Sequence, residues 1–156
     1  MMRKYSVTAS ITLLVIFIAA TSCKKDDNTC TVHPDAFRFS LVGADSGTDL
    51  LVTGEYKIDD IGIHYFYNDQ QNQLIINVEE NPAGDYTELF SAQLPMISLT
   101  RTETFYLRLS SQLTDTLVVV MGDEMLDGCR HHPYSLVTVN GVTLPTTGGD
   151  TFVIEK

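Results

Sequence analysis

The sequence predicts an all-β domain, and more specifically an antiparallel β-sandwich of about eight or nine short strands. From residue 36 onward, apolar side chains alternate with polar ones, which is the period of a strand with one buried face. Turn-forming residues separate these stretches at short intervals. No window of a dozen residues shows sustained helical spacing of apolar side chains, and four prolines interrupt the nearest approximations to it: Pro82, Pro95, Pro133 and Pro145.

The alternating stretches give the expected strands in chain order: residues 37–41, 61–67, 74–78, 105–110, 117–121, 137–139 and 152–154. The segment 117–121 (LVVVM) is apolar on both faces, so we expect it in the middle of the fold. The expected turns are residues 43–47, 68–72, 81–85 and 123–128. Asn140-Gly141 predicts a tight hairpin, because both residues tolerate the positive φ of a type I′ turn.

The number and spacing of these strands predict an immunoglobulin-like architecture, with a closed barrel as the alternative. The chain has no Trp and therefore lacks the Cys-Trp-Cys pattern of true immunoglobulin domains. The prediction concerns the general architecture and not membership of that family.

The N-terminus has the pattern of an export signal. Arg3 and Lys4 precede an uncharged, apolar stretch at residues 7–20, which is shorter than the roughly 20 residues of a membrane-spanning helix. The residues that follow, Ala20-Thr21-Ser22-Cys23, resemble the lipobox of bacterial lipoproteins, although Ala20 stands where Leu is commoner. The resemblance implies cleavage after residue 22 and a diacylglyceryl group on Cys23, with palmitate among the acyl chains. A retained membrane helix and an ordinary secretory signal are the alternatives.

Charged residues follow the lipobox at once, in the run Lys24, Lys25, Asp26, Asp27 and Asn28. This run resembles the export signal of surface lipoproteins of Bacteroidota, which implies a lipid-anchored protein of the outer membrane exposed at the cell surface. Display on the periplasmic face is the alternative. The expected organisation is a signal peptide at 1–22, a flexible lipidated tether at 23–35 and one β-domain at 36–156.

The charge of the exported chain excludes one class of partner. Removing residues 1–22 takes away two basic residues and no acidic one, so 8 basic and 20 acidic residues leave a formal net charge of −12. Such a body repels phosphate backbones, and we expect no nucleic-acid partner. We expect the membrane as a partner through the lipid anchor, together with a glycan or an envelope protein.

The two cysteines that lipidation leaves, Cys30 and Cys129, predict a disulfide, because exported proteins fold in an oxidising compartment. Two separate thiols are the alternative. A bridge would join the end of the tether to the domain.

Two groups of residues carry weak metal-ligand character. His131 and His132 follow Cys129 closely, and imidazole with thiolate is a zinc ligand set. Asp45 and Asp49 lie in one loop with hydroxyl groups, which suits Ca²⁺. We expect polar turns at both places, no bound metal, and no cofactor apart from the lipid on Cys23.

The sequence contains no catalytic motif: neither a Gly-x-Ser-x-Gly elbow, nor a Ser-x-x-Lys pair, nor a His-Glu-x-x-His zinc motif. We therefore expect a binding protein and not an enzyme. His64, Tyr65 and Tyr67 form an aromatic stretch that could stack on sugar rings. A small metal-dependent or hydrolytic envelope enzyme and a structural subunit of an envelope complex are the alternatives.

The C-terminal half also carries a resemblance to a family. Residues 104–110, Asp115-Thr116-Leu117, the lone Cys129 and residues 137–141 follow in an order and spacing similar to those of small uncharacterised lipoproteins of Bacteroidota. These features are strands and turns, so the resemblance implies a location and a fold and assigns no activity.

Overall fold

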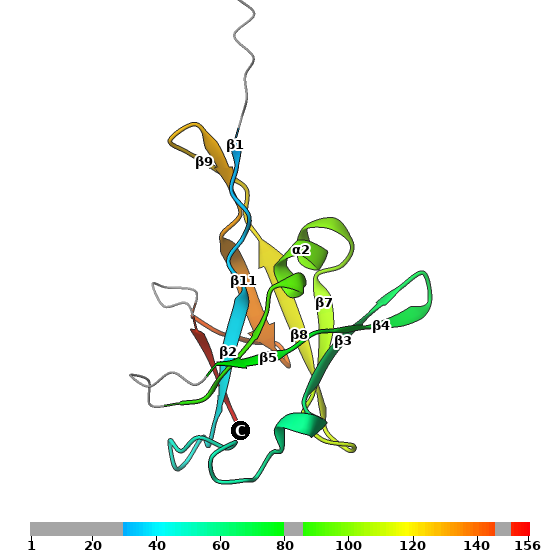
Figure 1. The fold of residues 1–156 in the computed structure, drawn as a ribbon, viewed down its shortest axis with the longest axis vertical. Coiled ribbons are helices and arrows are strands. Elements are labelled where there is room, and N and C mark those ends of the chain that lie inside the picture. Colours follow the sequence, from blue (N-terminus) through cyan, green and yellow to red (C-terminus); the bar gives the residue numbers. More distant parts are fainter. Residues whose placement is uncertain (1–29, 80–85, 146–150) are drawn as a thin grey trace, which may run out of the picture.

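The computed structural model describes residues 30–79, 86–145 and 151–156, which are mostly β-strands, as the sequence predicts (Figure 1). The described strands are β1 (Cys30–Thr31), β2 (Phe37–Val42), β3 (Gly62–Tyr67), β4 (Gln70–Leu74), β5 (Asn77–Glu79), β6 (Glu88–Ser91), β7 (Thr104–Arg108), β8 (Thr114–Met121), β9 (Glu124–Leu126), β10 (Cys129–His131), β11 (Tyr134–Val139), β12 (Val142–Thr143) and β13 (Thr151–Glu155). A 3-10 turn, η1 (Ile58–Asp60), and one α-helix, α2 (Gln93–Thr100), accompany them. The predicted signal peptide, Cys23 and the predicted turn at 81–85 lie outside the described residues.

The strands form three sheets. A six-stranded sheet has the order β12-β11-β8-β7-β3-β4, a four-stranded sheet has the order β13-β2-β6-β5, and a small sheet has the order β1-β10-β9. Most neighbouring strands are antiparallel, but β13 runs parallel to β2 and β1 runs parallel to β10. The apolar run at 117–121 lies within β8, which has β7 on one side and β11 on the other, so its expected place away from the sheet edges is confirmed.

The two larger sheets share one hydrophobic core. The four-stranded sheet contributes the fully buried Phe37, Phe39 and Leu41 of β2, while the six-stranded sheet contributes Phe105 and Leu107 of β7, among others. These are the alternate positions that the sequence marks as apolar, since successive side chains of a strand point to opposite faces. Burial of this set is the main stabilising contribution to the fold.

Two hairpins of the six-stranded sheet have type I′ residues at their turns. Asn140 and Gly141 adopt φ values of 50° and 80° between β11 and β12, which confirms the predicted hairpin. Asn68 and Asp69 do the same between β3 and β4, with φ values of 51° and 60°. This second turn is shorter than the predicted turn at 68–72, because Gln70–Leu74 is already strand β4.

The predicted strand at 74–78 was wrong as a single element. Leu74 ends β4 in the six-stranded sheet, whereas Asn77–Glu79 forms β5 in the four-stranded sheet. The chain crosses between the two sheets at this point. Leu74 and the partly buried Ile76 pack in the core, whereas the residues of β5 are exposed, so the apolar alternation of the sequence does not mark the crossing.

The helix α2 was not predicted. It is only eight residues long, and Pro95 is its third residue, where the backbone N–H has no acceptor within the helix. Proline is therefore tolerated there. The helix packs against the six-stranded sheet, where Ser98 Oγ donates a hydrogen bond of 2.6 Å to the carbonyl of Val119 in β8. Among the described residues, no helix has the length and apolar character needed to cross a membrane.

Residues 30–35, the last part of the predicted tether, contact the domain at three places. Cys30 and Thr31 form β1, which pairs with β10. A disulfide joins Cys30 to Cys129, whose Cα atoms lie 4.6 Å apart. The hydroxyl of Tyr134 donates a hydrogen bond of 2.7 Å to the carbonyl of Asp35. Burial, together with the nearby Asp35 carboxylate, raises the pKa of Tyr134, which keeps its hydroxyl a donor.

Candidate ligand-binding surface

Three rings lie together on the outer side of the six-stranded sheet, and we call them the outer aromatic surface: His64 and Phe66 of β3 and Tyr106 of β7. His64 and Tyr106 are paired across the two strands and stack with ring centroids 5.2 Å apart at 19°. Phe66 meets both edge to face, at 5.9 Å from His64 and 5.6 Å from Tyr106. Phe66 is 49% exposed, so the rings form an apolar platform at the surface.

Hydrogen-bonding side chains border this platform. A Cβ placed on Gly62 would lie 3.3 Å from Arg108 Nη2 and 3.4 Å from Gln73 Nε2, so the missing side chain leaves room for both groups beside His64. Arg108 is held in place because its Nε donates to the carbonyl of Asp60 at 3.1 Å. Rings flanked by amide and guanidinium donors can bind a ligand that has both an apolar face and hydroxyl groups.

The imidazole of His64 is kept neutral at physiological pH. Partial burial lowers its pKa, and the positive charge of Arg108 lowers it further. Across the strands, His64 faces Tyr106 on β7 and Gln73 on β4, neither of which carries an acidic group. A neutral ring extends the apolar platform instead of interrupting it with a charge.

The three binding residues expected from the sequence are divided between the two faces of the sheet. His64 lies on the outer aromatic surface, whereas Tyr65 is buried on the core side. Tyr67 shares the side of Tyr65, is 42% exposed, and has the guanidinium of Arg101 over its ring at 5.1 Å. Arg101 Nη1 also donates to the hydroxyl of Tyr65 at 3.0 Å. The three residues therefore do not form one site.

A groove of about 480 Å³ lies next to this arginine, between α2 and the β3–β4 hairpin. Its lining includes Tyr65, Asn72, Gln93, Met96 and Arg101. The guanidinium is already engaged by two tyrosines, and the Gln93 Oε1 atom accepts a hydrogen bond of 3.0 Å from the Ile75 amide. The polar groups of the groove are thus largely engaged in contacts within the protein.

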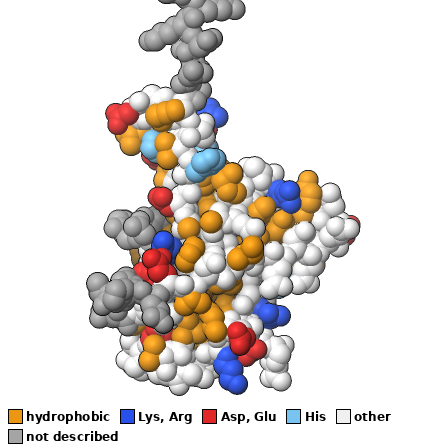
Figure 2. All heavy atoms as spheres, in the orientation of Figure 1, with side chains coloured by type: hydrophobic (Ala, Val, Ile, Leu, Met, Phe, Trp, Pro, Cys, Tyr) orange, Lys and Arg blue, Asp and Glu red, His pale blue; other side chains and the backbone are white. Residues whose placement is uncertain are grey.

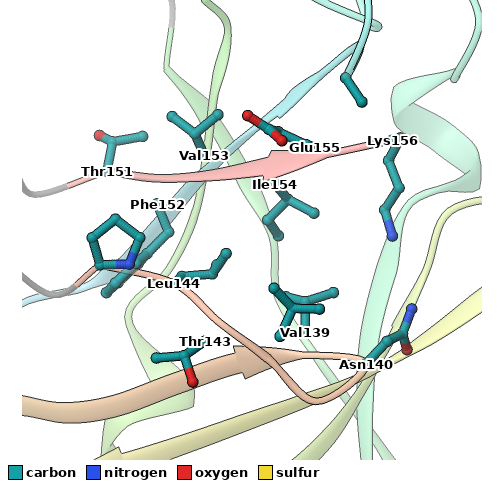
Figure 3. A pocket seen from close by; sticks show the side chains of 13 residues that line it. Val139, Asn140, Thr143, Leu144, Thr151, Phe152, Val153, Ile154, Glu155 and Lys156 are labelled. Carbon is teal, nitrogen blue, oxygen red and sulfur yellow. The ribbon is translucent and has the colours of Figure 1, made fainter.

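A second pocket, of about 640 Å³, lies between β12 and β13 (Figure 3). Val139 and Ile154 point toward one another across it, and the Lys156 side chain extends toward Asn140. Pro145 and Thr151 border it on either side of residues that the structure does not describe. We assign no ligand to this pocket for that reason.

Asp49, one of the suggested calcium ligands, serves the fold. Its Oδ1 accepts hydrogen bonds from the amides of Leu51 at 2.8 Å and Val52 at 3.2 Å, and its Oδ2 accepts one from the Thr87 amide at 2.5 Å. Burial raises the pKa of this carboxyl, but the hydrogen bonds outweigh burial and bring the pKa below its ordinary value. Asp45, the other suggested ligand, is exposed in the same loop.

His131 and His132 lie at the base of the β9–β10 hairpin. The Nδ1 atom of His132 is 3.1 Å from the carbonyl of Gly122, and because a carbonyl only accepts, Nδ1 is the donor in this hydrogen bond. Cys129 is bonded to Cys30 and so offers no thiolate. Within the described part of the chain, no three His, Cys, Asp or Glu side chains gather closely enough to hold a metal ion.

Sequence reasoning missed Tyr106, Arg108 and Gln73 as parts of a site. Tyr106 alternates with buried Phe105 and Leu107, so its outward direction was visible in the sequence. Its position beside His64 was not, because β3 and β7 are separated by more than thirty residues and local pattern does not give their register.

The comparisons with known proteins add no assignment: no protein-family model, no curated protein and no solved structure matches the chain.

Proposed function

We propose that this chain is an exported bacterial lipoprotein, anchored in the outer membrane through Cys23, whose β-domain binds a neutral saccharide on the outer aromatic surface. The observation that carries the binding proposal is the cluster of His64, Phe66 and Tyr106 beside Arg108. Sugar rings have apolar C–H faces and hydroxyl edges, which match aromatic rings and polar donors respectively.

The charge of the chain supports a neutral ligand over an acidic one. The whole chain has a formal net charge of −10, and removal of the signal peptide with Arg3 and Lys4 would leave −12. A protein of this charge repels polyanionic ligands. The one charged group described beside the rings, Arg108, hydrogen-bonds the Asp60 carbonyl and has donors left for hydroxyl groups.

The proposed location rests on the sequence pattern at the N-terminus. The lipobox-like Ala20-Thr21-Ser22-Cys23 and the charged run after it support a lipid anchor and display at the cell surface, in the manner of the Bacteroidota lipoproteins that the chain resembles. The periplasmic face is the alternative orientation. We propose no enzymatic activity, since no catalytic motif accompanies the aromatic surface.

We further propose that the two larger sheets pack face to face as a sandwich of immunoglobulin-like general architecture. The shared core supports this arrangement, because residues of both sheets belong to one buried cluster.

The anchoring is tested by expression of the full chain in an exporting bacterial host supplied with radiolabelled palmitate. We expect label in the membrane fraction, and we expect Cys23→Ala to abolish the label and release the protein. Membrane-bound protein without label would mean that residues 7–20 are retained as the anchor.

The binding is tested on a glycan array with the same full chain, extracted in detergent. Phe66→Ala should weaken any saccharide signal about tenfold, which corresponds to about 1.4 kcal/mol. The matched control is Tyr67→Ala, because Tyr67 is the next residue of β3, is similarly exposed and points to the other face. Loss of signal in the control alone would move the site to the groove beside Arg101.

A further inference from the structure

The small sheet β1-β10-β9 forms a projection at one end of the molecule (Figure 1). Asp127 and Gly128 turn the chain between β9 and β10, with φ values of 53° and 80°. Leu126 pairs with Cys129, which in turn pairs with Cys30, so these three residues form one row across the sheet next to the turn. The disulfide between Cys30 and Cys129 locks this row.

Large apolar side chains are exposed at the tip of this projection. Met125 is 57% exposed and Leu126 is 58% exposed, while Val32, the residue after β1, is 41% exposed. Alternation places Met125 and Leu126 on opposite faces of β9, and neither belongs to the hydrophobic core. Figure 2 shows hydrophobic and histidine side chains gathered at this end of the molecule. Two adjacent apolar side chains exposed at a projecting tip are a candidate contact surface for a membrane or a partner.

The position of Cys23 indicates what covers it. Cys23 precedes Cys30 by seven residues, so their Cα atoms are at most about 25 Å apart even when the chain is fully extended. Leu126 lies two strand spacings from Cys30, which is about 10 Å. Cys30, where the described residues begin, lies in the row next to the turn and beside the exposed apolar side chains, and the length of the intervening chain keeps Cys23 within reach of them.

We propose that Met125 and Leu126 insert into the interfacial region of the membrane that holds Cys23. This inference rests on the lipid anchoring proposed above. The lipid would hold the chain at the membrane, and the disulfide-locked tip would set the orientation of the domain relative to the membrane. An anchored domain has a high effective concentration at the bilayer, so two exposed side chains are enough to make the contact persistent.

The charges of the tip indicate the kind of lipid surface. The hairpin carries three acidic residues, Asp123, Glu124 and Asp127, and one basic residue, Arg130, so its Asp, Glu, Lys and Arg side chains sum to a formal charge of 1 − 3 = −2. Arg130 Nε lies 3.3 Å from Asp123 Oδ1, so the only cation of the hairpin is already paired. The contact is therefore expected with neutral headgroups and not with an anionic surface.

The test uses the absence of Trp from the chain, which makes a single introduced Trp a clean probe. Leu126→Trp is made in the full chain, expressed in an exporting host, and reconstituted in phosphatidylcholine vesicles whose acyl chains are brominated. We expect the emission of this Trp to shift to the blue and to be quenched by the bromine atoms. Met125→Trp provides a second probe of the same tip and should behave alike.

The matched control is Val142→Trp. Val142 is 67% exposed and follows the hairpin turn at the far end of β11, away from the tip. Its Trp should remain unshifted and unquenched. Equal emission from the Trp at position 126 and the Trp at position 142 would overturn the proposal. The proposal would also be overturned if the tip were shielded from aqueous acrylamide but not quenched by brominated lipid, since that result means that a protein covers the tip. Palmitate labelling of the same preparations reports the anchor separately, so failure of anchoring and failure of the tip contact are distinguishable.

Discussion

Asp49→Asn should destabilise the fold, and the structure gives the size of the effect. The substitution keeps an acceptor for the amides of Leu51 and Val52, but it replaces Oδ2 with an NH₂ group that cannot accept the hydrogen bond from the Thr87 amide. A hydrogen bond to a charged group contributes about 1.5–3 kcal/mol, and the remaining two bonds lose their charge. We therefore expect a loss of about 2–3 kcal/mol in the free energy of unfolding at pH 7.

Urea denaturation of the full chain, followed by tyrosine fluorescence and circular dichroism, measures this loss. The pKa of Asp49 lies below its ordinary value of 3.8 in the folded protein. Its contribution is therefore fully present above pH 3.8 and is lost as the pH falls through the folded-state pKa. The Asn variant should lack this component of the acid sensitivity.

The control for this variant is Asp45→Asn, which removes the same charge from an exposed position of the same loop. It should change stability by no more than about 0.5 kcal/mol. If the two variants lose the same small amount, the carboxylate of Asp49 does not organise the loop and the argument fails. If added Ca²⁺ raises the stability of the wild type but not of either variant, the loop is a metal site after all.

Three further predictions follow from other contacts. Replacing both Cys30 and Cys129 by Ser should cost up to about 4–5 kcal/mol in the chain-entropy model, because the disulfide spans 99 residues; an unchanged denaturation midpoint would contradict this. Lys156→Met should cost about 3 kcal/mol, because it leaves the buried carboxylate of Asp115 without its cation, and a stability equal to that of wild type would show that the pair is dispensable. The imidazole of His64 should titrate below pH 6.5 by NMR, with its stabilising contribution fully present above that pH and lost as the pH falls; a midpoint at or above 6.5 would refute the desolvation argument.

The strands with one buried face were predictable because their signal is local. Phe37, Phe39 and Leu41 alternate with less apolar residues and are buried as expected, and the Asn140-Gly141 dipeptide forms the expected turn. The β9–β10 hairpin was predicted only as a turn at 123–128, since Glu124–Leu126 has neither a buried face nor an alternating pattern. The Asp127-Gly128 turn closes this hairpin locally, whereas the pairing of β10 with β1 and the disulfide join segments that are far apart in the sequence.

The candidate site was predictable only in part. His64 could be found from its place in an aromatic stretch, but the same stretch also suggested Tyr65 and Tyr67, which point to the other face of the sheet. Alternation along β3 separates these residues by direction, yet it does not say which face is the core. The core face is the one on which Tyr65 packs with Phe105 of β7, and the outer face is the one on which His64 meets Tyr106, so both are defined only by the long-range pairing of β3 with β7.

The central claim is that the outer aromatic surface binds a neutral saccharide. NMR titration of the isotopically labelled protein with a saccharide selected on the array tests it most directly, because each ring reports separately. We expect the side-chain resonances of His64, Phe66 and Tyr106 to shift together with saturable dependence on ligand concentration, while those of Tyr67 and Arg101 stay in place. Shifts confined to Tyr67 and Arg101, or no saturable shift with any neutral saccharide, would contradict it.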